Sequence, residues 1–178
     1  MLRKGGGGGE APVSGGRPHG GGVGKTAACQ ALKRMAENSV FLDGDWCWDM
    51  HPFRVTEETR AMVLDNIAFL LNRFLRCSAL EHVIFGWVMH RQEIIDAILA
   101  RVDTAGCAVR PISLVCRSEV LHARIQGDVA AGRRDAGAVE RGLSYLPLYR
   151  HLHTEQIDTS ELTPEQVARR ILERSQRI

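Results

Sequence analysis

Short strand-like segments alternate with helical patterns along most of this chain. Four segments are typical of strands, and they cover residues 39–42, 82–88, 109–115 and 155–160. The clearest helical pattern follows Thr56, where apolar residues recur at helical spacing at Val63, Ile67, Leu70 and Phe74. Because strands that alternate with helices are joined by crossover connections, this pattern predicts a parallel sheet flanked by helices.

Further helices are predicted from their ends and their periodicity. Small and apolar residues recur at helical spacing over residues 26–37, directly after a glycine-rich loop. Helical patterns begin again near Arg91 and Ser118. The last helix is expected to have Thr163 as its N-cap and Pro164 at its first position. The chain is therefore predicted to belong to the α/β class.

The first residues differ in composition from the rest of the chain. Residues 1–18 are rich in glycine and contain almost no large apolar side chains, so they cannot offset the entropy lost on ordering. We therefore predict that residues 1–18 are disordered and that residues 19–178 form one domain. A chain of 178 residues with 44% hydrophobic residues is sufficient for one ordinary core.

A glycine-rich run joins that segment to the first predicted helix. It reads Gly20-Gly21-Gly22-Val23-Gly24-Lys25-Thr26. Glycines allow successive backbone N–H groups to surround a phosphate, Lys25 would reach its outer oxygens, and the Thr26 hydroxyl would coordinate magnesium. The residues from Gly21 to Ala27 are therefore predicted to bind a nucleoside triphosphate. The alternative is a glycine-rich linker that contains Gly-Lys-Thr by chance.

The run departs from the full phosphate-loop pattern in two respects. The pattern needs a glycine five residues before Gly24, and His19 occupies that position. Such a loop also follows a buried strand, whereas residues 1–19 contain no apolar run. We therefore predict that the first strand of the sheet is degenerate or missing.

Polar residues follow two of the predicted strands at the same edge of the sheet. Asp43 and Asp45 flank Gly44 after the first predicted strand, so a turn there can direct both carboxylates toward a ligand, and one could hold magnesium-bound water. The alternative is an Asx-turn that only ends the strand. His90 and Arg91 follow the next strand and are predicted to contact substrate, although a histidine in such a position is often structural.

Charge and cysteine content exclude several classes of protein. A formal net charge of +2 gives no clustered basic surface, which makes nucleic acid an unexpected partner. Five cysteines without a CxxC pair argue against a disulfide framework and a structural zinc site, and they favour a reducing cytoplasm. The sequence shows neither a secretion signal nor an apolar stretch of about 18 residues that could span a membrane.

Four motifs together resemble those of the P-loop small-molecule and nucleotide kinases, a group that includes gluconokinase, adenylylsulfate kinase, shikimate kinase and chloramphenicol phosphotransferase. The motifs are GVGKT at 22–26, FLDGDW at 41–46, an arginine-bearing segment at 117–141, and IDTSELTPEQVARRI at 157–171. The resemblance covers roughly residues 20–175 and extends to bacterial proteins described as AAA-family ATPases. It implies a three-layer fold with about five parallel strands, which holds its substrates at the carboxyl ends of the strands.

The resemblance also implies roles for individual residues. Catalysis would rest on Lys25, Asp45, Arg124, Arg133 and Arg134, the arginines belonging to a lid over residues 117–141. Thr26 and Asp43 would serve the metal, and Thr159 and Ser160 would pass the adenine ring. The acceptor would contact Asp43, Asp45, Trp46, Trp48, His90 and Arg91. Each group also has an alternative interpretation. The tryptophans would pack beneath the next helix, and the lid arginines would pair in solvent with Asp128, Asp135 and Glu140. Thr159 and Ser160 would only precede a helix cap.

The predicted function is an ATP- and Mg²⁺-dependent phosphotransferase that transfers the γ-phosphoryl group to a small-molecule or nucleotide acceptor. The main rival is a nucleotide-binding protein or slow ATPase without kinase activity, which the degenerate first strand favours. A nucleic-acid end kinase shares the loop chemistry, but the weak charge bias speaks against it. The protein is expected to be a monomer or a homodimer, and the sequence specifies neither the acceptor nor a preference for ATP over GTP.

Overall fold

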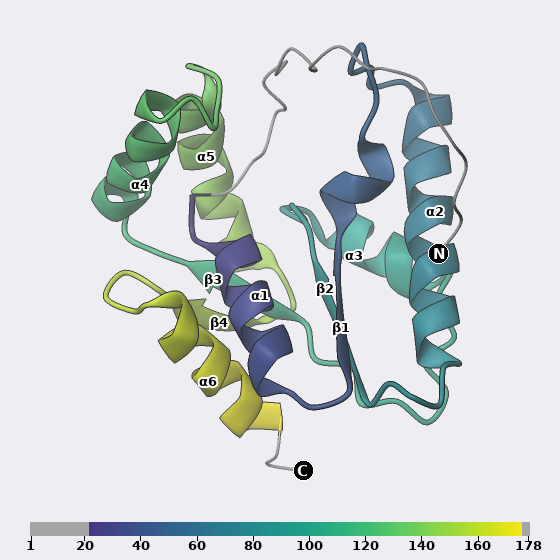
Figure 1. Cartoon of the computed structure of the whole chain (residues 1–178). Coiled ribbons are helices and arrows are strands. Elements are labelled where there is room, and N and C mark those ends of the chain that lie inside the picture. Colours follow the sequence, from purple (N-terminus) through teal and green to yellow (C-terminus); the bar gives the residue numbers. More distant parts are fainter. Residues whose placement is uncertain (1–21, 176–178) are drawn as a thin grey trace, which may run out of the picture.

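The computed structural model describes residues 22–175 and has the α/β architecture expected from the sequence (Figure 1). Its elements in chain order are α1 (Lys25–Met35), β1 (Ser39–Asp43), the 3₁₀ helix η1 (Gly44–Trp48), α2 (Glu57–Leu75), β2 (His82–Gly86), α3 (Gln92–Leu99), β3 (Ile112–Val115), α4 (Ser118–Ala130), α5 (Ala138–Tyr145), the 3₁₀ helix η2 (Leu146–His151), β4 (Glu155–Asp158) and α6 (Pro164–Ser175). The predicted disorder of residues 1–18 lies outside the described residues.

The strands of residues 22–175 form two parallel pairs, whereas the resemblance implied one sheet of about five strands. Strand β1 pairs with β2 from Ser39↔His82 to Asp43↔Gly86, and β3 pairs with β4 from Ile112↔Glu155 to Val115↔Asp158. Among the described residues, no strand leads into α1. The chain that would supply such a strand precedes Gly22, and its sequence has no apolar run that could fill a buried strand position. The described strands therefore number four.

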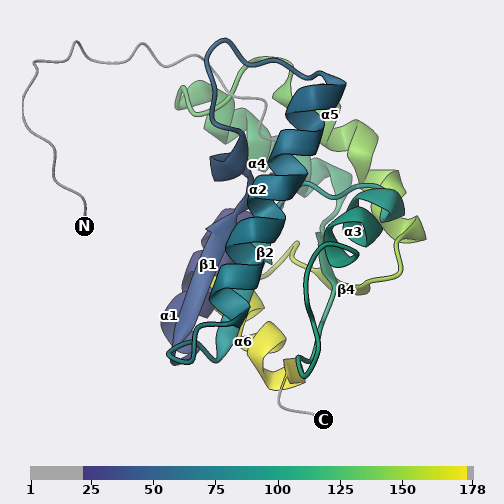
Figure 2. The ribbon, with the colours of Figure 1, turned by 90° about the vertical axis from the view of Figure 1, so that its right-hand side faces the viewer.

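Helices cover both faces of the β1–β2 pair, which gives the three layers. Helix α1 packs on one face, and α2 lies on the other face with α3 beside it (Figures 1 and 2). Side chains alternate between these faces along each strand. Leu42 and Phe85, which are register partners, pack with the α2 residues Val63, Ile67 and Leu71. Ile84 points to the other face and packs with Ala31 and Leu32 of α1.

The β3–β4 half has its own core, which includes the loop before α1. Leu114 and Ile157 pack with Leu121 and Ile125 of α4, and Val23 belongs to the same cluster. Helices α1 and α6 pack against each other between the two halves. They approach closely because small residues, Ala31 and Ala168, lie fully buried at their contact. The β-strand pairs are thus held together chiefly through α1 and its loop.

Local hydrogen bonds explain where the predicted helices begin. Thr56 and Thr59 form a reciprocal capping box at the start of α2, with bonds of 2.9 and 3.1 Å. Thr163 and Gln166 do the same for α6, which begins at Pro164 as predicted. The predicted apolar stripe of α2 is confirmed for Val63 and Ile67, which are fully buried. None of the described helices is both long and apolar enough to cross a membrane.

Candidate functional site

The loop before α1 has the backbone shape that close contact with a phosphate requires. Gly24 has φ 87°, a left-handed conformation that favours glycine, and its carbonyl accepts the first helical hydrogen bond from Ala28 at 2.9 Å. A Cβ on Gly22 would lie 2.3 Å from Cγ1 of Ile125, so only glycine fits against α4 there. Lys25, Thr26 and Ala27 follow in the first turn of α1, whose N–H groups have no partner within the helix. Gly21 lies outside the described residues.

Asp43 joins the end of β1 to the start of α1. Its Oδ2 accepts a hydrogen bond from the Thr26 hydroxyl at 3.1 Å, and its Oδ1 accepts one from the Asp45 N–H at 3.1 Å. The second bond forms the Asx-turn that the sequence offered as an alternative, and the first brings together the two residues predicted to serve the metal. One carboxylate therefore fixes the turn and contacts the residue that follows Lys25.

Lys25 lies among charges of both signs at the start of α1. Burial lowers the pKa of its ammonium group to about 8; the carboxylates of Asp45 and Asp43 oppose this decrease, and the nearby positive charge of Arg134 adds to it. A bound polyphosphate would favour the charged form in the same position. The site therefore contains a cation whose proton affinity depends on what fills the loop.

Asp45 is held by an indole from the neighbouring strand. The Nε1–H of Trp87, directly after β2, donates to Oδ1 of Asp45 at 3.1 Å. The contact depends on Gly44, because a Cβ there would lie 2.4 Å from Cγ of Trp87. Gly44 thus lets the indole ring pass beneath η1 and orient the carboxylate. The Asp-Gly-Asp motif provides this geometry, but the sequence did not indicate Trp87 as its partner.

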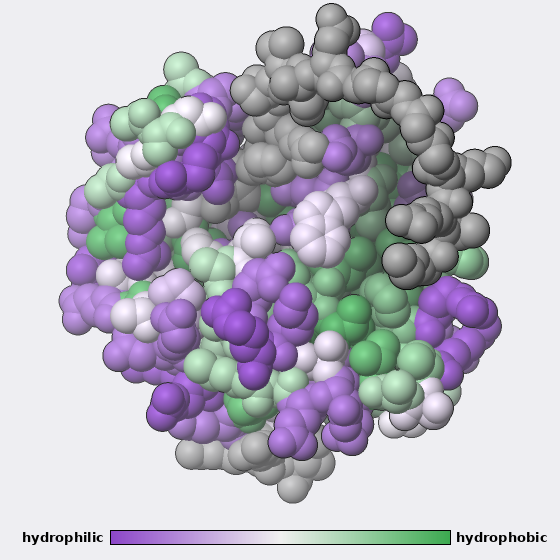
Figure 3. All heavy atoms as spheres, in the orientation of Figure 1, coloured by the Kyte–Doolittle hydropathy of each residue, from purple (hydrophilic) through white to green (hydrophobic). Residues whose placement is uncertain are grey.

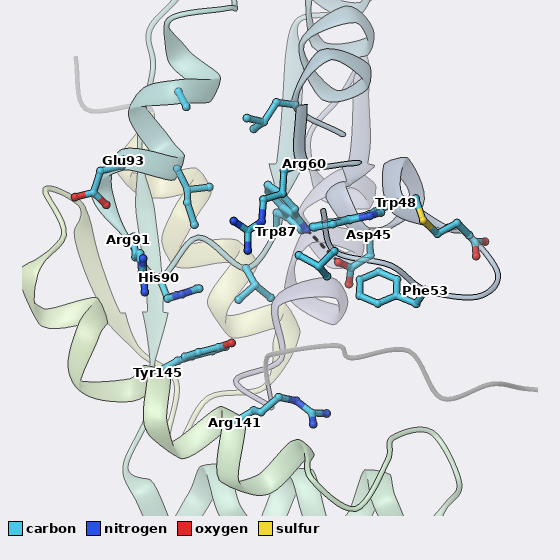
Figure 4. Close-up of a pocket in the computed structure, with 17 residues that line it drawn as sticks. Asp45, Trp48, Phe53, Arg60, Trp87, His90, Arg91, Glu93, Arg141 and Tyr145 are labelled. Carbon is cyan, nitrogen blue, oxygen red and sulfur yellow. Dashed lines mark hydrogen bonds between the residues drawn. The ribbon is translucent and has the colours of Figure 1, made fainter. Parts of the chain in front are cut away.

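A cavity of about 730 Å³ opens beside Asp45. It lies between the ends of β1 and β2, the start of α2 and helix α5, and the residues around it are drawn in Figure 4. In the orientation of Figure 1, hydrophobic side chains gather over the half of the molecule that contains β1, β2 and α2 (Figure 3). The volume of the cavity is within the range of pockets that bind small organic ligands, roughly 300–1,000 Å³.

Aromatic rings form one wall of the cavity. The indole of Trp48 packs against Phe53 and Trp87, with ring centroids 5.3 and 6.2 Å apart. Trp46 does not line the cavity; it is 56% exposed and packs on Phe41. Of the two tryptophans predicted to contact the acceptor, the structure therefore brings only Trp48 to the cavity. Both Asp45 and Trp48 lie in its lining, whereas Asp43 is buried behind them.

His90 and Arg91 form part of the opposite side. The His90 ring stacks on Tyr145 of α5, with centroids 4.1 Å apart and planes 5° from parallel. Burial lowers the pKa of His90, and the positive charge of Arg91 lowers it further, so a neutral imidazole is favoured. Arg91 is exposed and also lines the cavity. Two predicted contact residues therefore lie at the cavity, and the stack connects them to α5, which begins within the predicted lid.

Comparison with known proteins agrees with this architecture. Residues 21–141 match the family AAA_18, described as an AAA domain. This chain belongs to that family. No curated protein matches the chain significantly.

Solved structures show the fold of this AAA_18 protein more fully. A tunicamycin resistance protein from Deinococcus radiodurans is 17% identical over 87% of this chain and 90% of its own, with a TM-score of 0.64. A sugar kinase from a Janibacter species is 18% identical over 85% and 87%, with a TM-score of 0.57. A candidate kinase from Chloroflexus aurantiacus is 19% identical over 86% and 90%, with a TM-score of 0.53. The predicted P-loop kinase fold is confirmed.

The arginines of this AAA_18 domain make distinct contacts in the predicted lid. Arg133 and Arg134 bind Asp128 at 2.8 and 2.9 Å, and Arg141 pairs with Asp135. Burial opposes ionisation of Asp128, but the hydrogen bonds from both arginines outweigh it and lower the pKa of that carboxyl. The alternative pairing with Asp128 and Asp135 is therefore present.

Arg124 turns instead toward the segment that follows β4. Its Nη1 and Nη2 donate to Oγ1 and the carbonyl of Thr159 at 3.2 and 2.8 Å. Thr159 is fully buried, and its hydroxyl also contacts the carbonyl oxygen of Val23 at 3.3 Å. Ser160 accepts from the Arg117 N–H at 2.9 Å. Arg124 and Thr159 are thus tied to the loop before α1, whereas Ser160 is tied to the start of α4.

The cavity includes residues that the sequence did not single out. Arg60 of α2 and Tyr145 of α5 both line it. Arg60 lies before the apolar stripe of α2 and looks in the sequence like any exposed polar residue of a helix, so no local signal could have identified it. The described residues contain no cluster of three or more His, Cys, Asp or Glu side chains that could hold a metal ion unaided.

Proposed function

We propose that this AAA_18 protein is an ATP- and Mg²⁺-dependent phosphotransferase that acts on the hydroxyl group of a small-molecule acceptor. The observation that carries the proposal is a chain of hydrogen bonds: Thr26, next to Lys25, is bonded to Asp43, and Asp43 is bonded to the backbone of Asp45. The 3.1 Å contact between Thr26 and Asp43 joins the start of α1 to the turn that carries Asp45 to the cavity. A nucleotide at α1 and an acceptor in the cavity would therefore meet at Asp45.

The start of α1 supports nucleotide binding. Its N–H groups, the left-handed Gly24 and the Lys25 ammonium favour a polyphosphate. Thr26 and Asp43 offer two oxygens of the kind that Mg²⁺ prefers, and they are the residues that would hold it, the remaining ligands being water and phosphate. When bound, Mg²⁺ would neutralise charge on the phosphates. Arg134, whose charge reaches Lys25, would contribute in the same sense.

Asp45 would orient the acceptor and take its proton. In the transfer, the acceptor oxygen forms a bond to the γ-phosphorus while the bond from that phosphorus to the bridging oxygen breaks. ADP leaves with the electron pair, and the hydroxyl proton passes to Asp45. Trp87 would keep this carboxylate in position, because its Nε1–H donates a hydrogen bond to Oδ1 of Asp45. Positioning and charge neutralisation would account for most of the catalysis.

The cysteines and the proposed phosphate donor also bear on the compartment in which the protein acts. We place its activity in the cytoplasm, since all five cysteines are free thiols in the structure and ATP is the proposed donor. One neighbour in structure is a sugar kinase and another a tunicamycin resistance protein, which supports a small organic acceptor. A slow ATPase without an acceptor is the second candidate, favoured by the separation of the strands into two pairs.

Transfer of labelled phosphate distinguishes the two candidates. The protein is incubated with γ-³²P-labelled ATP, Mg²⁺ and pools of sugars, nucleosides and hydroxy acids, and the label is followed into small molecules and into inorganic phosphate. We expect label in one acceptor pool, and a decrease of about 10²–10⁴-fold in Asp45→Asn with unchanged affinity for ATP.

Asp65→Asn is the matched control, because Asp65 is an exposed carboxylate on α2 with only a 3.6 Å ion pair to Arg101. It should transfer label at the wild-type rate. Label found solely in inorganic phosphate, at equal rates in wild type and Asp45→Asn, would refute the kinase proposal and favour the ATPase.

A further inference from the structure

The cavity beside Asp45 has two surfaces of different chemistry, and together they restrict the acceptor. One surface is made of stacked aromatic rings and aliphatic side chains, and the other contains arginines. Figure 4 shows Arg60 extending beside Trp87, and Arg91 next to His90 on the other side of the labelled group. The following inference rests on the proposed function, because it concerns the acceptor of the same reaction.

The aromatic surface is suited to a flat ring. Trp48, Phe53 and Trp87 come from η1, the following loop and the end of β2, and their edges and faces meet at 46° and 58°. The side chains of Leu64 and Ile94 extend this apolar lining. A planar apolar body gains contact with rings on more than one side, whereas a small polar sugar would leave much of that area unfilled. The walls therefore favour a ring-bearing molecule.

The charges of the lining are equal in number but different in arrangement. Three arginines (Arg60, Arg91 and Arg141) and three carboxylates (Asp45, Asp49 and Glu93) line the cavity. Arg141 is paired with Asp135, and Asp45 is bound by Trp87. Glu93 points away from the other labelled side chains (Figure 4).

Neither Arg60 nor Arg91 forms an ion pair with any carboxylate in residues 22–175, and Glu93 forms none with a basic side chain there. The two arginines come from separate elements, α2 and the N-cap of α3, so two guanidinium groups reach one cavity from different directions. Guanidinium groups bind carboxylate and phosphate oxygens through paired N–H donors. Two guanidinium groups that form no ion pair with a described carboxylate can therefore bind the oxygens of one anion from two directions.

We infer that the acceptor is an anionic, ring-bearing molecule whose hydroxyl group faces Asp45. Its ring lies against Trp48 and Trp87, and its carboxylate or phosphate binds Arg60 and Arg91. A neutral sugar leaves both arginines without a partner, and a small anion without a ring leaves the aromatic wall empty. The shared chemistry is an oxyanion joined to a planar ring system.

Ligand-observed saturation-transfer NMR tests the inference without requiring turnover. The protein is first saturated with Mg²⁺ and a non-hydrolysable ATP analogue, so that phosphate-bearing probes cannot occupy the nucleotide site. Four probes separate ring from charge: 3-phenyllactate, 3-phenyl-1,2-propanediol, lactate and glycerol. Uridine and uridine 5′-monophosphate then separate a phosphate from a carboxylate as the preferred anion.

We expect the charged ring probes to bind at least about tenfold more tightly than their neutral counterparts. In Arg60→Gln/Arg91→Gln this advantage should decrease to about threefold or less, since the guanidinium contribution is lost. Arg73→Gln is the matched control, because Arg73 is exposed on the same helix α2 but does not line the cavity. Its selectivity should equal that of the wild type.

Three outcomes would overturn the inference: equal binding of charged and neutral ring probes, a charge preference that persists in the double variant, or tighter binding of lactate than of 3-phenyllactate. These results leave the kinase proposal intact if labelled phosphate is transferred to some other class of acceptor. Conversely, failure of the ATP analogue to bind would refute the proposed function, while the probe selectivity could still be measured in its absence. The two failures are therefore distinguishable.

Discussion

Replacement of Gly44 by alanine tests how the candidate base is held. The ideal Cβ of an alanine would lie 2.4, 2.6 and 2.8 Å from Cγ, Cδ1 and Cβ of Trp87. Carbon atoms in contact are separated by about 3.5–4.0 Å, so either the indole or the η1 turn must move by roughly 1 Å. Two of these three atoms lie near the backbone of Trp87, and they cannot move as freely as the end of a flexible side chain. The φ of Gly44 is not positive, so the cost comes from the contact rather than from backbone strain.

Two magnitudes follow from this overlap. Overpacking of this kind reduces the free energy of unfolding by about 1–3 kcal/mol. A movement of roughly 1 Å would also break the 3.1 Å hydrogen bond from Trp87 to Asp45, and a misplacement of that size in a catalytic group lowers turnover by about 10²-fold. Affinity for ATP should be unchanged, because Lys25 and Thr26 are not displaced.

Urea denaturation and the labelled-phosphate assay measure the two effects of Gly44→Ala. A double-mutant cycle with Trp87→Ala isolates the contact: once the indole is removed, the alanine should cost about 1 kcal/mol less or be neutral. Gly127→Ala is the matched control, because no atom lies within 4 Å of its added Cβ in α4, and it should stabilise the protein by about 0.5–1 kcal/mol. Wild-type stability and turnover in Gly44→Ala would refute the reasoning.

Two further predictions concern the loop before α1. Folding lowers the pKa of Lys25 from an ordinary value of 10.5 to about 8, so the protein without ATP loses this proton above pH 8. The apparent Kd for ATP should therefore rise above pH 8, by up to about tenfold per pH unit. In Lys25→Arg, calorimetry should find no such rise, because arginine keeps its charge. The unfolded chain keeps that proton longer, so between pH 8 and 10.5 the contribution of Lys25 to the free energy of unfolding should increase with pH, which urea titrations of wild type and Lys25→Met would show or exclude. Thr159→Val removes a buried hydroxyl that contacts the carbonyl oxygens of Val23 and Val115 and one N–H of Arg124. The midpoint of calorimetric unfolding should therefore decrease by about 4–8 °C, which corresponds to roughly 2 kcal/mol in the free energy of unfolding. An unchanged midpoint would show that these contacts do not stabilise the fold.

Much of the fold could be predicted because its signals are local. The stripe from Val63 to Phe74, the caps at Thr56 and Thr163, and the glycine-rich loop each specify a short piece of backbone by its own residues. The lack of an apolar run before Gly22 predicted a degenerate or missing first strand, but it did not predict that the described strands would form two separate pairs.

The site was predicted less completely because its contacts join distant residues. Trp87 reaches Asp45 across 42 positions, and Tyr145 stacks on His90 from a helix that the sequence indicated only as part of a lid. Trp46 and Trp48 are two residues apart and look equivalent in the sequence. The turn of η1 directs one into the cavity and leaves the other on Phe41. Spacing along the chain cannot decide between such neighbours.

Calorimetric titration with ATP and Mg²⁺, run on the wild type and on Lys25→Ala, tests the central claim most directly. The loop geometry predicts micromolar binding to the wild type, with one site per chain, and a loss of at least about 100-fold in the variant. Circular dichroism establishes that both proteins are folded. If the folded wild type shows no binding, or if Lys25→Ala binds as tightly, the start of α1 is not a nucleotide site and the proposed phosphotransferase is contradicted.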